Sequence, residues 1–216
     1  MDYLQQLDTQ ALLLLNGMHT AFLDRFMWLV ANRFAWALMV AVLLALLARQ
    51  GWRRSLVMLV AIALTVLIAD QLASGLIKPL VMRLRPSHDP RLEHTLHILN
   101  GYRGGLYGFV SSHASNTFGV ALLVMLLLRN RWATLTLCAW TALVCYSRMY
   151  EGVHYPGDIL GGLLVGALAA VAVHAACRRL WLRHPQLQVH FDEVDTKWLI
   201  FGFFVNLLIL IGLAVF

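Results

Sequence analysis

The sequence predicts an all-α protein that crosses a membrane with six helices. Three observations support this fold class: 60% of the 216 residues are hydrophobic, only 13% are charged, and the mean hydropathy is +0.71. A membrane-spanning helix needs about 20 mostly apolar residues, and six apolar runs of the chain approach or reach this length. The chain length favours a single domain over residues 1–216.

The net charge of +6 does not indicate a nucleic-acid partner. The arginines gather at the ends of apolar runs, and this pattern is typical of membrane proteins, whose orientation it sets. Cys138, Cys145 and Cys177 lie inside apolar runs and therefore indicate no disulfide framework. The composition does not predict an oligomeric state.

Residues 1–24 are predicted to be an amphipathic segment that lies in the membrane interface. Five apolar residues share one helical face: Leu4, Leu7, Ala11, Leu14 and Leu15. The run ends at Gly17, so it is too short to cross about 30 Å of hydrocarbon. Its acidic start argues against a cleaved signal peptide.

The six spans are expected at roughly residues 26–48, 55–80, 113–128, 132–148, 157–178 and 198–216. A polar, glycine-rich loop at 83–111 separates the second span from the third. Basic residues cluster in three connections: Arg49, Arg53 and Arg54; Arg129 and Arg131; and Arg178, Arg179, Arg183 and Lys197. Positive residues favour the cytoplasmic side. The loop at 83–111 and the connection after the fourth span then share the outer face, and the N-terminal segment lies there by the same parity.

The first polar cluster lies at the outer end of the second span. Lys78 and Arg85 flank six residues, and Pro86 ends any helix. The two cations either mark the membrane boundary by snorkelling to the surface or belong to a functional site. Asp70 lies inside the same span, and it is interpreted as a structural hydrogen-bonding group or as a group that tunes Lys78.

The second cluster precedes the third span and contains Ser111, Ser112 and His113. A serine at this place can simply cap the helix. A helix N-terminus with free amides and hydroxyls is also an anion site, and His113 is a candidate general acid there.

The third cluster follows the fourth span. Arg148 carries a planar, permanently charged fork that suits phosphate oxygens. His154 is a candidate nucleophile or base. Asp158 follows one helical turn later, where a carboxylate can hold one ring nitrogen and leave the other free. Ionisable groups at a membrane boundary are costly, so three such clusters on one face predict a functional site.

These clusters resemble the three signature motifs of the type-2 phosphatidic acid phosphatase superfamily. The resembling patterns are Lys78-x6-Arg85-Pro86, Ser111-x-His113, and Ser147-Arg148-x5-His154-x3-Asp158. The middle motif departs from the usual Pro-Ser-Gly-His because Val110 and Ser112 replace Pro and Gly. Loss of the glycine alters the backbone freedom of the turn but removes no amide donor.

The resemblance implies a mechanism. His154 attacks phosphorus and forms a phosphohistidine, Asp158 orients His154, and His113 protonates the leaving oxygen. The phosphate oxygens are held by Lys78, Arg85, Arg148, Ser111 and Ser112. Three cations take the place of the magnesium ions that many phosphoryl-transfer enzymes use, so no metal or other cofactor is expected. The loop at 83–111 also carries His88, His94 and His97, for which we consider a metal site, a mobile lid over the lipid headgroup, or a solvated loop.

The resemblance is strongest to bacterial undecaprenyl diphosphate phosphatases, partly through the local sequence Phe109-Val-Ser-Ser-His-Ala-Ser-Asn116. It implies an enzyme of the bacterial inner membrane whose site faces the periplasm or exterior and whose substrate is a lipid phosphate among membrane lipids. The alternatives are a lipid A 1-phosphatase, a phosphatidic acid or phosphatidylglycerophosphate phosphatase, and a phosphotransferase. A non-catalytic transporter of anionic lipids explains the cations but not the combination of His113, His154 and Asp158.

Overall fold

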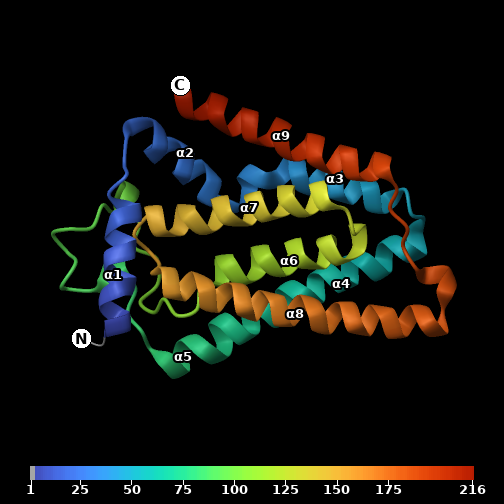
Figure 1. The fold of residues 1–216 in the computed structure, drawn as a ribbon, viewed down its shortest axis with the longest axis horizontal. Coiled ribbons are helices and arrows are strands. Elements are labelled where there is room, and N and C mark those ends of the chain that lie inside the picture. The colour runs from blue at the N-terminus through green and yellow to red at the C-terminus, as the bar shows by residue number, and fades with distance from the viewer. Residues whose placement is uncertain (1–2) are drawn as a thin grey trace.

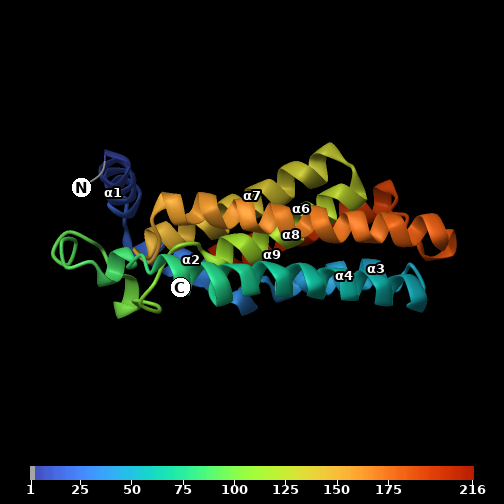
Figure 2. The ribbon, with the colours of Figure 1, turned by 90° about the horizontal axis from the view of Figure 1, so that it is seen from below.

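A computed structural model describes residues 3–216; Met1 and Asp2, the first residues of the predicted interfacial segment, lie outside them. The described chain is helical, with a single isolated β-bridge in place of any sheet. Long helices run side by side in one bundle, and α1 lies across one of its ends (Figures 1 and 2). The α-helices are α1 Tyr3–Asn16, α2 Ala21–Ala31, α3 Ala37–Ala48, α4 Trp52–Asp70, α5 Lys78–Val81, α6 Ser112–Leu128, α7 Arg131–Tyr150, α8 Pro156–Arg183 and α9 Glu193–Val215.

Three helical stretches are long and apolar enough to cross a membrane: Trp52–Val81, Pro156–Arg183 and Glu193–Val215. The bent pair α2 and α3 makes a fourth if it is counted as one span, and α6 is an apolar helix of 17 residues. All six expected spans correspond to helices near the expected bounds. The number of membrane crossings stays a prediction.

The first expected span is not one continuous helix. It is broken between α2 and α3, which meet at an angle of 75° across a 3-10 turn, Arg33–Trp36. The side chain of Asn32 accepts a hydrogen bond from the Phe34 amide, 2.9 Å away, and so caps this turn. The sequence analysis placed a span at 26–48 but did not predict this break, which forms where a short polar side chain competes for backbone donors.

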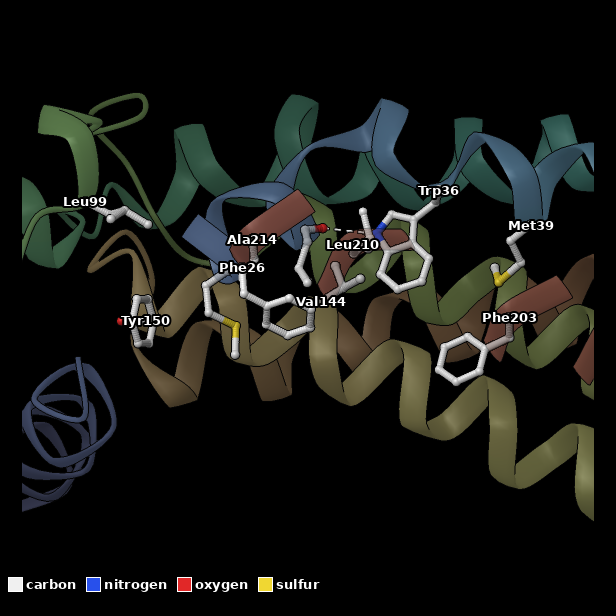
Figure 3. Packing of buried hydrophobic residues seen from close by; sticks show 11 residues of the cluster. Phe26, Trp36, Met39, Leu99, Val144, Tyr150, Phe203, Leu210 and Ala214 are labelled. Carbon is white, nitrogen blue, oxygen red and sulfur yellow. Dashed lines mark hydrogen bonds between the residues drawn. The ribbon is translucent and has the colours of Figure 1, made fainter. Parts of the chain in front are cut away.

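The backbone groups that the break frees are satisfied by buried side chains. The Trp36 indole donates to the Val30 carbonyl at 3.0 Å, as the dashed line in Figure 3 shows, and Asn206 of α9 donates to the Ala35 carbonyl at 2.8 Å. Asn206 is only 2% exposed. Irregular backbone is tolerated at membrane depth where protein groups satisfy it, so the break is a supported feature of the fold.

The largest part of the core packs around this break. Side chains of α2, α3, α7 and α9 meet in one buried cluster (Figure 3). Its members include Phe26, Trp36, Met39, Val144 and Phe203, with Trp36 stacked on Phe203 at 6.1 Å between ring centres.

The second expected span continues from α4 through a π-helical segment, Gln71–Ile77, into α5. Three connections lie together at one end of the bundle: α3–α4, α6–α7 and α8–α9 (Figure 1). These are the connections rich in basic residues. The opposite end carries α1, the loop at 82–111 and the turn between α7 and α8.

Helices α6 and α8 approach closely because glycines line their contact. A β-carbon at Gly166 would overlap the Ser115 carbonyl oxygen and would lie 2.9 Å from the Gly119 nitrogen, both backbone atoms of α6. Such contacts between small residues are a common way to pack helices in membranes.

Replacing Gly166 by alanine is expected to lower the free energy of unfolding by about 2 kcal/mol or more, because the α6 backbone cannot move away as a side chain can. Gly212→Ala in α9 is the matched control, since a β-carbon there meets nothing within 4 Å. The measurement is the unfolding midpoint of each purified variant in detergent. Equal midpoints for the two variants would contradict the close contact.

Candidate active site

The three polar clusters come together at the end of the bundle that carries α1. The end of α5, the start of α6, the end of α7 and the start of α8 meet there (Figure 1). Hydrogen bonds join the clusters directly: Lys78 Nζ donates to Ser112 Oγ at 2.5 Å, and Arg85 Nη1 lies 2.9 Å from His154 Nε2. The site is therefore built from elements that are up to 80 residues apart in the chain.

His154 lies in the turn before α8 and is almost fully buried. Its Nδ1 atom lies 3.3 Å from Asp158 Oδ2, and the same carboxylate oxygen accepts the Tyr155 amide at 3.0 Å. Pro156 begins α8, which places Asp158 in the first helical turn. Because a carboxylate accepts hydrogen bonds, we assign the ring proton to Nδ1, so that Nε2 presents its lone pair to Arg85.

The environment of His154 keeps its imidazole neutral. Burial lowers the pKa of His154 well below its ordinary value, and the positive charges of Arg85, Lys78 and Arg148 lower it further. A neutral imidazole with one free nitrogen is the form that can attack phosphorus.

A second carboxylate reaches this pair from α1. Asp8 accepts hydrogen bonds from Arg83 Nη2 at 2.6 Å and from the Gly157 amide at 2.7 Å. Arg83 Nη1 in turn donates to Asp158 Oδ1 at 3.1 Å, and the Arg83 guanidinium lies 4.1 Å from the centre of the Tyr155 ring. A continuous chain of contacts thus joins the N-terminal helix to the carboxylate that holds His154.

Arg85 is held by a short antiparallel bridge between the two ends of the loop. Its amide donates to the Leu106 carbonyl at 3.0 Å, and the Gly108 amide donates to the Arg83 carbonyl at 2.8 Å. A β-carbon at Gly108 would lie 2.8 Å from Asp158 Oδ2, so a larger residue here would displace the carboxylate from its present contacts. The bridge therefore fixes the arginine against the His154–Asp158 pair.

The start of α6 uses its two serines differently. Ser111 is fully buried, and its hydroxyl accepts the Ala114 amide at 3.5 Å, which supports the capping interpretation. Ser112 instead contacts Lys78. His113 is exposed and lines a cavity together with Arg148.

Asp70, the last residue of α4, makes hydrogen bonds to α6 and to the π-helical segment. Its Oδ1 atom accepts from Asn116 Nδ2 at 3.3 Å and from Ser74 Oγ at 3.5 Å. The Ser74 and Ser112 hydroxyl oxygens are 2.8 Å apart. Asp70 is thus a structural hydrogen-bonding group that is also linked through two hydroxyls to Lys78, as the tuning interpretation requires.

Arg148 forms a buried ion pair with Glu151, a residue that the sequence did not single out. Their side chains are 4% and 1% exposed, and Arg148 Nη2 lies 2.5 Å from Glu151 Oε2. Burial raises the pKa of Glu151 to about 7, although the charges of Arg148 and Arg85 act in the opposite direction. Glu151 therefore gains its charge at a higher pH than an exposed glutamate does.

This ion pair predicts a pH dependence. As the pH rises through about 7, Glu151 ionises and competes with a phosphate group for Arg148, so kcat/KM is expected to fall several-fold. Glu151→Gln keeps the size and cannot ionise, so its kcat/KM should fall less over the same range. The measurement is kcat/KM from pH 5.5 to 8.5 for both proteins on one substrate, which cancels the ionisation of the substrate itself. Superimposable profiles would rule out this role of Glu151.

The loop histidines do not converge. His88 Nε2 lies 3.3 Å from the Gly104 carbonyl oxygen, whereas His97 contacts Asp24 at 3.2 Å and stacks on His19. Within residues 3–216, no group of three His, Cys, Asp or Glu side chains is arranged to hold a metal ion. His94 is exposed.

The loop itself is packed against the bundle. Leu92 and Leu96 are buried against Leu12 of α1 and against Tyr155. The Tyr155 hydroxyl donates to Asp89 at 3.0 Å, and the hydrogen bonds from Arg91 lower the pKa of Asp89 to about 2. The solvated-loop interpretation is therefore wrong, because this segment carries its own apolar anchors.

Three residues of this site were missed by the sequence analysis: Asp8, Arg83 and Glu151. Glu151 follows Arg148 by three residues, a spacing that puts both side chains on one helical face and would have indicated the pair. Arg83 lies within the first motif, two residues before Arg85. Asp8 gives no local signal, since its partners lie far along the chain.

Several known proteins share extended similarity with this chain. A model of the PAP2 superfamily matches residues 54–182. The lipid A 4′-phosphatase of Bacteroides thetaiotaomicron is 38% identical over 84% of this chain and 82% of its own length. The lipid A 4′-phosphatase of Porphyromonas gingivalis is 37% identical over 84% of this chain and 79% of its own length.

A putative undecaprenyl-diphosphatase of Escherichia coli is 36% identical, but over only 30% of this chain and 32% of its own length. Among solved structures, a transmembrane PAP2-type phosphatidylglycerolphosphate phosphatase from Bacillus subtilis superposes with a TM-score of 0.62. That match covers 83% of this chain and 88% of the other at 20% identity, so it shows a shared fold.

Proposed function

Because this chain belongs to the PAP2 superfamily and is a membrane phosphatase that acts on lipid phosphates, we propose that it removes the 4′-phosphate of lipid A. The observation that carries this substrate is the similarity to two lipid A 4′-phosphatases along 84% of the chain. The comparisons favour the lipid A alternative over undecaprenyl diphosphate, whose putative phosphatase matches only 30% of the chain. They also favour the 4′ position over the 1 position that the sequence analysis named.

His154 is the nucleophile of this proposal. Its Nε2 lone pair attacks phosphorus, a nitrogen–phosphorus bond forms, and the bond from phosphorus to the sugar oxygen breaks. His113 gives its proton to that oxygen. Water then attacks the phosphohistidine, loses a proton to His113 and releases inorganic phosphate, so that His154 returns to its neutral state. Asp158 stabilises the imidazole throughout through its contact with Nδ1.

The cations bind the phosphate oxygens. Arg85 Nε and Arg148 Nε are buried and have no hydrogen-bond partner in the described part of the chain. Buried donors without partners are costly, and a phosphate that binds between them would satisfy both. Lys78 with the Ser112 hydroxyl supplies a third positive contact. The Ser111 amide donates to the Asp158 carbonyl at 2.9 Å and its hydroxyl oxygen accepts the Ala114 amide, so the hydroxyl proton is the donor that Ser111 has left for the phosphate. Preorganised donors of this kind are worth about 3 kcal/mol each.

We further propose that the site opens at the periplasmic side of the bacterial inner membrane. The basic connections lie at the opposite end of the bundle, as the positive-inside bias requires for the cytoplasmic end. Leu4, Leu7 and Leu14 of α1 are exposed at the site end, which supports contact of this helix with the membrane interface.

The test is phosphate release by the purified protein in detergent with excess chelator. Lipid A with phosphates at positions 1 and 4′, undecaprenyl diphosphate and phosphatidic acid are compared, and the lipid product is identified by mass spectrometry. The proposal expects the highest kcat/KM on lipid A, with loss of the 4′-phosphate and no effect of the chelator. Loss of only the 1-phosphate would refute the position, and faster release from undecaprenyl diphosphate would refute the substrate.

A further inference from the structure

A cavity lies between the reacting residues and the break in the first span. Its volume is ≈ 500 Å³. One side is formed by His113, Arg148 and Glu151 of the active site, and the other side comes from α2, the 3-10 turn and the loop: Trp28, Ala31, Asn32, Arg33, Phe34 and Tyr102. The bend of 75° between α2 and α3 thus directs a set of side chains toward the place where phosphate binds.

The side of the cavity that α2, the 3-10 turn and the loop form is both polar and aromatic. Arg33 is exposed, its guanidinium lies 5.3 Å from the centre of the Phe34 ring, and within residues 3–216 no carboxylate lies within 4 Å of its nitrogens. Trp28 and Tyr102 stand nearly perpendicular at 6.0 Å between ring centres and are 38% and 40% exposed. An arginine beside aromatic rings is suited to bind an anionic group attached to a sugar. The ring faces pack on apolar sugar surfaces, and the guanidinium binds phosphate oxygens.

The break between α2 and α3, which positions these side chains, costs free energy. A discontinuous helix leaves backbone groups to be satisfied at membrane depth, and the buried Asn206 and Trp36 are used for this purpose. In membrane proteins, interrupted helices recur where a bound anionic group must meet helix ends.

We propose that this cavity is a second binding site for the substrate headgroup, in which Arg33 binds a second phosphate of a phosphorylated glycolipid and Trp28 and Tyr102 contact its sugar. This inference rests on the proposed function, because lipid A offers such a group in its other phosphate. Arg33 is then a specificity-determining residue: it touches a part of the substrate that does not react.

The test follows the logic of a double-mutant cycle, in which one change is made in the protein and the other in the substrate. Arg33→Ala is assayed on lipid A with both phosphates and on lipid A that carries only the 4′-phosphate. With both phosphates present, KM is expected to rise about tenfold or more, the usual effect of one charge-assisted hydrogen bond, while kcat stays within about twofold. On the substrate with one phosphate, Arg33→Ala should change KM little, because the two changes remove the same contact.

Arg131→Ala is the matched control. Arg131 also lies over the ring of the next residue, at 5.1 Å from the centre of Trp132, but at the opposite end of the bundle. Its KM should equal that of the wild type on both lipids. Equal KM increases for Arg33→Ala on both lipids, or no increase on either, would overturn the second site while leaving the 4′-phosphatase activity in place. A wild-type protein that releases no 4′-phosphate from lipid A would refute the proposed function and this inference with it.

Discussion

His154→Ala is expected to reduce the rate of phosphate release by a factor of at least about 10⁴, because the variant has no nucleophile at the position that all three cations surround. His154→Asn should lose as much activity. Its amide can still donate to Asp158, so it separates loss of the nucleophile from loss of the buried hydrogen bond.

The measurement is kcat for lipid A in detergent, together with the thermal midpoint of each variant. His174→Ala in α8 is the control, since this histidine lies at the other end of the bundle among Arg129, Arg178 and Trp181. A folded His154→Asn protein that keeps a tenth of the wild-type rate would exclude His154 as the nucleophile.

Asp158→Asn is expected to lower kcat by about 10⁴-fold, as the loss of an orienting carboxylate does in an Asp-His pair. The amide group would favour the ring tautomer with its proton on Nε2, so the nitrogen that faces Arg85 would lose its lone pair. The thermal midpoint should also fall, because Arg83 and the Tyr155 amide lose their charged acceptor.

Asp8→Asn tests the outer end of the same chain of contacts. Asp8 contacts Arg83 and the Gly157 amide but not His154, so a loss of less than about tenfold is expected from its more distant position. A loss as large as that of Asp158→Asn would contradict this order of contacts and would place Asp8 in the reaction itself.

The positions of the helices could be predicted from the sequence because apolar runs of adequate length are a local signal. The break at Asn32 could not be, since Asn32 and Arg33 are only two polar residues in an apolar region. One of the two side chains that stabilise the break, Asn206, lies 171 residues from the carbonyl that it binds. A local pattern cannot show which distant side chain will satisfy a freed carbonyl.

In the candidate site, too, local features could be predicted from the sequence and contacts between distant residues could not. The three clusters were predicted as neighbours because the alternation of spans brings their ends to one face. The spacing of His154 and Asp158 predicted a contact one helical turn apart, and the two atoms lie 3.3 Å apart. The contact of α1 with the site was not predicted. An amphipathic pattern describes the apolar face of this helix, and it does not indicate what Asp8 on the polar face contacts.

The central claim is that a covalent phosphate forms on His154. The direct test is a rapid base quench of the enzyme mixed with lipid A that is labelled in its 4′-phosphate, followed by peptide mapping, since phosphohistidine survives base and is lost in acid. The account predicts label on the peptide that contains His154 and loss of that label in the His154→Asn protein. Label on any other residue, or full turnover with label on none, would contradict it.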